Sequence, residues 1–152
     1  MIDKQLDIIR QPRLKIIETL NAFSLDQLNK IPSGFNNNII WNLGHMIAAQ
    51  QGVCYKRAGL NTWIDDDFFD AYKPDSKPAG PVSQDEYDNI KTLLTTSIDQ
   101  LEHDYKNGIF ENYPTWTTRY GVQMSNIDEA IAFLPFHEGL HIGYIMAMRK
   151  LV

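Results

Sequence analysis

The chain has 152 residues, a net charge of −5 and an isoelectric point near 5.2. This length suits one hydrophobic core, so we expect residues 1–152 to form a single domain. Lysine and arginine do not cluster, which argues against nucleic-acid binding. No apolar stretch approaches the ~20 residues of a membrane span, and the N-terminal residues lack the apolar core of a signal peptide. With Cys54 as its single cysteine, the chain is predicted to be an acidic, cytoplasmic, globular protein.

The first part of the chain predicts one long helix and one short one. Apolar residues recur at helical spacing from about Asp3 to Ala22, and Arg13 falls in the same stripe. Pro12 lies inside this segment and predicts a kink or a later start. Ser24-Leu25-Asp26-Gln27 has the form of a capping box and predicts a further short turn.

The other long helices are predicted from their caps and stops: one from residues 36–38 to Gly59, one from Ser83 to Gly108, and one from Ser125 or Asn126 to the end. Between the last two, alternating residues from Thr115 to Val122 predict a short hairpin. Four long helices with so little strand predict an all-α fold. We expect a four-helix bundle of antiparallel type with long crossover loops.

The string His137-Glu138-Gly139-Leu140-His141 is the most informative motif. Two histidines four apart on a helix point the same way, so one metal ion can bind both. The string also matches HExxH, the zinc helix of many metalloproteases. No His, Glu, Asp or Cys follows His141, so a third ligand, if there is one, must come from upstream. The pair lies on an apolar face, where a metal or hydrogen bonds to other groups would satisfy the ring nitrogens.

The two upstream histidines differ in their surroundings. His103 lies between charged residues and is expected to be a solvated residue near a helix end. His45 lies in an apolar helical run, on the side that also carries Trp41, Ala49 and Gly52. Spacing alone leaves His45 open between a metal ligand and a hydrogen-bonded core histidine.

These features together resemble the DinB-like (YfiT-like) superfamily of small four-helix bundles, over the whole chain. The resemblance rests on Trp41 followed by His45, and on the pair His137 and His141 followed by Ile-Gly. It implies that His45, His137 and His141 bind a divalent metal ion, with nickel or zinc as the usual metal in relatives. It also implies a possible small-molecule or low-molecular-weight thiol substrate and a homodimer.

Two functions of different class follow. The first is a metal-dependent enzyme with thiol-dependent transferase or hydrolase chemistry at a three-His site, which leaves coordination positions open. The alternative is a non-catalytic metal-binding, dimeric stress-response protein. A metalloprotease is a more distant third. An open position facing a solvent-connected pocket would favour the enzyme.

Three further expectations concern residues around the site. Glu138 lies ~80° from the mean direction of the two histidines, so it either reaches a metal-bound water or faces a neighbouring helix, and we expect no ligand role for it. Residues 65–67, three consecutive aspartates, predict an acidic helix cap or surface turn and not a calcium site. Apolar residues on several sides of the second and fourth long helices require a partner or covering loops around Trp63 and Trp116; they include Trp41, Ile47, Phe133, Phe136 and Ile142.

Overall fold

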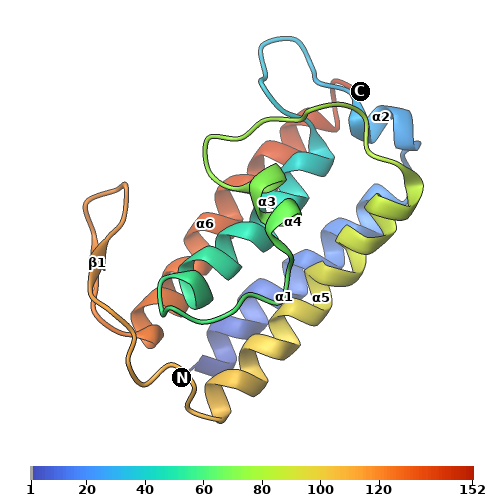
Figure 1. Cartoon of the computed structure of the whole chain (residues 1–152). Coiled ribbons are helices and arrows are strands. Elements are labelled where there is room, and N and C mark those ends of the chain that lie inside the picture. The colour runs from blue at the N-terminus through green and yellow to red at the C-terminus, as the bar shows by residue number, and fades with distance from the viewer. Residues whose placement is uncertain (1) are drawn as a thin grey trace.

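The computed structural model describes residues 2–152 and is dominated by helices (Figure 1). The elements are, in chain order, α1 (Ile2–Leu20), α2 (Leu25–Asn29), α3 (Ile39–Gln51), the π-helical turn η1 (Gly52–Lys56), α4 (Asp66–Tyr72), α5 (Gln84–Lys106), β1 (Trp116–Thr117), β2 (Gln123–Met124) and α6 (Ile127–Met148). The all-α prediction is therefore confirmed. The expected hairpin is present as the antiparallel pair of β1 and β2.

Four helices, α1, α3, α5 and α6, form the bundle. α1 packs against α5 and α6, and α3 packs against the same two helices. In Figure 1, α1 and α6 run in one direction, and α3 and α5 run in the other. Two of the neighbouring pairs are therefore antiparallel and two are parallel. α3 and α5 are parallel and follow one another among the long helices, so they need a long crossover connection, which the segment after η1 provides. The segment after α5 joins α5 to the oppositely directed α6.

Local signals set most helix boundaries. Ser24 and Ser83 form complete capping boxes with Gln27 and Glu86, at the starts of α2 and α5. α1 begins at Ile2 and continues through Pro12, so the later start is wrong. The second long helix does not remain regular to Gly59. It becomes π-helical at Gly52, where Arg57 N donates to Gly52 O over 3.1 Å.

The segment between η1 and α5 covers the outer face of α3. It contains the short helix α4, with Asp65 as its N-cap, so the acidic helix cap is the one of the two predicted forms that residues 65–67 take. Every residue of α3 is buried, because α4 closes the side that the other bundle helices leave open. Trp63 anchors the start of this segment, since its Nε1 donates to Asp104 of α5 over 2.9 Å. For α3, the segment around Trp63 therefore provides the cover within the chain, which is one of the two possibilities that the sequence left open.

Candidate metal centre

α3 carries His45 at the middle of the bundle. Its N-cap is Asn38, whose side chain accepts from Trp41 N over 2.8 Å. Because α3 is apolar on all sides, it is buried on all sides, and His45 is only 5% exposed. Trp41, one turn before it, stacks on the His45 ring with centroids 4.8 Å apart and planes 13° apart.

α6 carries the other two histidines. Its N-cap is Asn126, whose side chain accepts from Glu129 N over 2.9 Å. His137 and His141 follow one turn apart, and both are partly buried against α3. α3 and α6 are antiparallel here, because His141 contacts Asn42 whereas His137 contacts His45, which comes later in α3.

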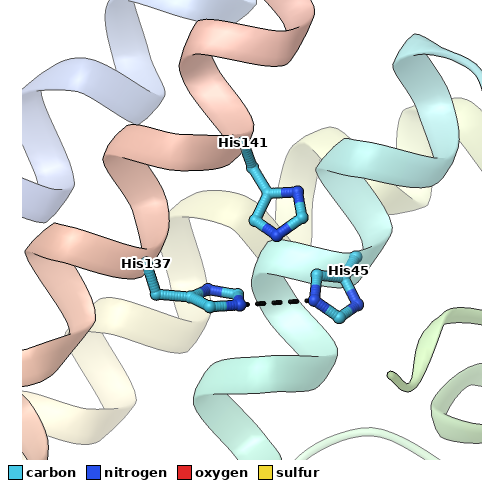
Figure 2. A group of neighbouring side chains, drawn as sticks. All are labelled: His45, His137 and His141. Atoms are coloured by element: carbon cyan, nitrogen blue, oxygen red, sulfur yellow. Dashed lines mark hydrogen bonds between the residues drawn. The ribbon is translucent and has the colours of Figure 1, made fainter. Parts of the chain in front are cut away.

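Figure 2 shows the three imidazole rings pointing toward one another from the two helices. Each offers one ring nitrogen, and these atoms all lie within 4.8 Å of one another. Nε2 of His45 and Nε2 of His137 are 3.3 Å apart. Two nitrogens bound to one tetrahedral zinc ion at about 2.0–2.1 Å lie about 3.3 Å apart. The cluster could therefore hold a divalent ion, with this pair already at the spacing that such an ion requires.

Hydrogen bonds to two of the rings fix which nitrogen faces the centre. His45 Nδ1 donates to the backbone carbonyl of Tyr72 over 2.7 Å, because a carbonyl can only accept. His141 Nδ1 lies 2.8 Å from Asn42 Oδ1. The Asn42 amide cannot be reversed, since its Nδ2 donates to the carbonyl of Asn38 over 2.8 Å. Both rings thus present a free Nε2 lone pair to the centre, as metal-binding histidines require.

The contact between His45 and Tyr72 depends on Gly44. A Cβ atom at position 44 would lie 2.6 Å from Cγ of the Tyr72 ring, which is too close for any side chain. Gly44 therefore lets α4 approach α3 closely enough for the Tyr72 carbonyl to reach His45. The position of α4 thus determines the orientation of His45 in the histidine cluster.

Burial keeps all three imidazoles neutral. Burial, together with the neighbouring His45, lowers the pKa of His137 to about 4 and that of His141 to about 3. Burial also lowers the pKa of His45, and the hydrogen bond to Tyr72 offsets part of this effect. Neutral imidazoles are the form that binds metal ions, so the centre is ready to bind one at neutral pH.

A cavity of about 1500 Å³ lies in front of the three histidines, which form part of its wall. Other parts of the wall come from η1, from the loop after α4 and from the hairpin of β1 and β2. Asp75, Lys77 and Tyr120 line it and are exposed, so the cavity opens to solvent between that loop and the hairpin. Among residues 2–152, the cluster of possible ligands contains no side chain besides the three histidines.

Glu138 does not face the cavity, although it sits between the histidines in the motif. Its carboxylate accepts from Arg13 of α1, with Nη2 to Oε1 at 2.5 Å and Nε to Oε2 at 3.1 Å. Both side chains are buried. Of the two placements that the sequence left open, the structure has the one in which Glu138 faces a neighbouring helix.

Arg13 connects Glu138 to the rest of the bundle. Its guanidinium also donates to Gln50 Oε1 of α3 over 3.2 Å, and to Leu94 O and Ser97 Oγ of α5 over 3.0 and 3.1 Å. One side chain from α1 thus contacts all three other long helices. The carboxylate next to His137 is held in place by this network.

The structure brings His45, His137 and His141 together, and it leaves His103 apart. His103 is exposed near the end of α5, as expected, and its Nε2 lies 2.8 Å from Asn107 Nδ2. Sequence reasoning missed Asn42, the carbonyl of Tyr72 and the role of Arg13. Only Arg13 had a visible signal, namely a charged residue within the apolar stripe of α1.

A family model for the DinB superfamily matches residues 8–145. The chain belongs to the DinB superfamily. The match begins within α1, ends within α6 and includes the three histidines of this DinB-superfamily protein, in agreement with the resemblance inferred from its motifs. A comparison with curated proteins gives no match. Within residues 2–152, no helix combines the length and apolar character needed to span a membrane.

Proposed function

We propose that this protein is a metal-dependent enzyme that holds one divalent ion, nickel or zinc, on His45, His137 and His141. The observation that carries the proposal is the convergence of three neutral imidazoles on the wall of a solvent-connected cavity. A closed structural zinc site uses four protein ligands, whereas a catalytic site uses three and leaves a position for water or substrate.

The reaction class follows from this ligand set. A divalent ion with three imidazole ligands supplies Lewis-acid activation of a water, a thiol or a carbonyl group. The chain's own residues hold the rings in place: the Tyr72 carbonyl orients His45, and Asn42 orients His141. The stacked Trp41 prevents the His45 ring from turning away from the centre. Thiol-dependent transfer and hydrolysis both fit this arrangement.

The two other functions are less well supported. A purely structural ion is less well supported, because His45 and His141 have hydrogen-bond partners without it. A zincin-like protease needs its glutamate as a general base, whereas Glu138 is bound to Arg13.

Metal analysis of the protein purified without a histidine tag tests the metal site. We expect about one nickel or zinc ion per chain, and loss of the ion in His45→Ala, His137→Ala and His141→Ala. His103→Ala is the matched control, because His103 is exposed and outside the cluster. Unchanged metal content in the three variants, or equal loss in the control, would refute the assignment.

A screen of the metal-loaded protein then tests the reaction. Low-molecular-weight thiols are offered with electrophilic acceptors, and ester and amide substrates are offered without a thiol. Turnover that the chelated protein and His137→Ala lack would support the enzyme. A protein that binds the ion tightly but turns over none of these compounds would favour the non-catalytic alternative.

A further inference from the structure

The cavity carries the opposite charge from the molecule as a whole. The chain has a net charge of −5, yet four cationic side chains and a single carboxylate line the cavity. The cations are Lys56, Arg57, Lys77 and Arg119, and the carboxylate is Asp75. A concave surface lined by one sign of charge concentrates ligands of the opposite sign. The cavity is therefore expected to favour anionic ligands, although the chain as a whole is acidic.

The cations occupy the rim and are held there by different contacts. The Arg57 guanidinium lies 4.4 Å from the ring centroid of Trp116 in β1, which ties the end of η1 to the hairpin. Arg119, at the tip of the same hairpin, reaches Asp75 of the opposite loop at 3.9 Å. Both members of that pair are mostly exposed, so the contact is weak and leaves Arg119 free to bind another anion.

An aromatic wall lies between this rim and the histidines. Phe133 and Phe136 of α6 line the cavity, and Phe133 lies 6.2 Å from the His137 ring, centroid to centroid. Phe136 meets Tyr120 of the hairpin edge to face at 5.2 Å. Phe136 and Tyr120 remain about half exposed, at 52% and 50%. A flat apolar group placed here would cover them and lie beside the proposed metal position.

We propose that the cavity binds a small molecule with a flat apolar body and an anionic group, with the anion at Arg119 and Lys77 and the body against Phe133 and Phe136. An arginine guanidinium binds a carboxylate through two parallel hydrogen bonds, and Lys77, which lines the same cavity, adds charge. The binding of this molecule does not depend on a metal ion, because none of these four residues belongs to the metal cluster. Any reaction of the bound molecule rests on the proposed function.

The test uses metal-free protein and three naphthalene probes of the same shape: 2-naphthoate, the uncharged 2-naphthalenemethanol and the cationic 2-naphthylmethylamine. Dissociation constants come from ligand-observed NMR titrations. We expect 2-naphthoate to bind about tenfold more tightly than the alcohol, and the amine to bind most weakly. The preference should shrink in 0.5 M salt, because the rim charges are exposed and screened.

The double variant Arg119→Gln/Lys77→Gln should bring 2-naphthoate and the alcohol to within about twofold of each other. Arg149→Gln/Lys150→Gln is the control, since it removes the same charge outside the cavity. Equal binding of the three probes, no binding at all, or an equal effect of the control would overturn the proposal. Metal binding is measured on the same samples, so failure of the anion site and failure of the metal site are separate results.

Discussion

The Glu138 carboxylate and the Arg13 guanidinium form a buried, two-point ion pair between α6 and α1, with bonds of 2.5 and 3.1 Å. The pair reaches the backbone beside two of the three histidines, because Glu138 follows His137 and Arg13 Nη2 lies 3.4 Å from the carbonyl of Met46, the residue after His45. The motif that resembles a protease active site thus contributes two histidines to the cavity and one carboxylate to the bundle interior.

Removing one partner of this pair should strongly destabilise the protein. Arg13→Ala leaves a buried carboxylate without its counter-charge, and we expect the free energy of unfolding to fall by about 3–5 kcal/mol. Urea denaturation measures this loss. Lys15→Ala is the control on the same helix, because its ion pair with Glu18 is exposed and is worth about 0–1 kcal/mol. Equal losses in the two variants would contradict the role of the buried pair.

Asn42→Ala should weaken metal binding without unfolding the protein. The variant loses the acceptor that orients His141, and loss of such a partner typically lowers metal affinity about 10–100-fold. Competition with a chelator of known affinity measures the change. Asn61→Ala, in an exposed position, serves as the control and should leave the affinity unchanged. If both variants bind the ion as tightly as the native protein, His141 does not depend on Asn42.

Two glycine substitutions should have opposite effects. Gly44→Ala forces Tyr72 away from α3 and so withdraws the carbonyl that orients His45, which should lower both stability and metal affinity. Gly139→Ala, between the histidines of α6, meets nothing within 4 Å and should raise stability by about 0.5–1 kcal/mol. Thermal unfolding and chelator competition are measured for both. A Gly44→Ala protein as stable as Gly139→Ala would show that α4 adapts freely.

The metal-free protein should lose stability as the pH falls from about 6.5 toward 4. The pKa values of His137 and His141 are lowered to about 4 and about 3 in the folded state, below the ordinary value of 6.5. In this window the unfolded chain takes up protons that the folded chain does not, so the free energy of unfolding decreases with decreasing pH.

Urea denaturation between pH 7.5 and 5.5 measures this effect above the range in which carboxylates titrate. The double variant His137→Gln/His141→Gln should flatten the pH dependence, whereas His103→Gln should retain it. If the free energy of unfolding of the double variant depends on pH as strongly as that of the native protein, groups other than these two histidines cause the dependence.

We also expect a homodimer in solution. Trp41 and Ile47 are covered within the chain and Phe136 lines the cavity, whereas Leu140 and Tyr144 share one face of α6 and are 39% and 53% exposed. Light scattering at micromolar concentration measures the mass. Leu140→Ser/Tyr144→Ser should shift a dimer toward the monomer, and Ile8→Ser, at an exposed apolar site on α1, should not. A monomer mass that persists on concentrating the native sample would contradict the expectation.

Local sequence was sufficient for most of the elements and for two of the three histidines. Capping residues such as Ser24, Ser83 and Asn126 form hydrogen bonds within three or four residues, so the starts of α2, α5 and α6 could be predicted without knowledge of the fold. The shared direction of His137 and His141 is also local, because it follows from helical geometry alone.

Only the tertiary structure decided which residues of the other helices lie next to His137, Glu138 and His141. His45 and His137 are 92 residues apart in the chain, His141 and Asn42 are 99 apart, and Arg13 and Glu138 are 125 apart. Helical periodicity gives the direction of each side chain relative to its own helix, but not which helix lies opposite. The order of packing, with α3 beside α6 and α1 behind them, placed His45 at the cavity and Glu138 against Arg13.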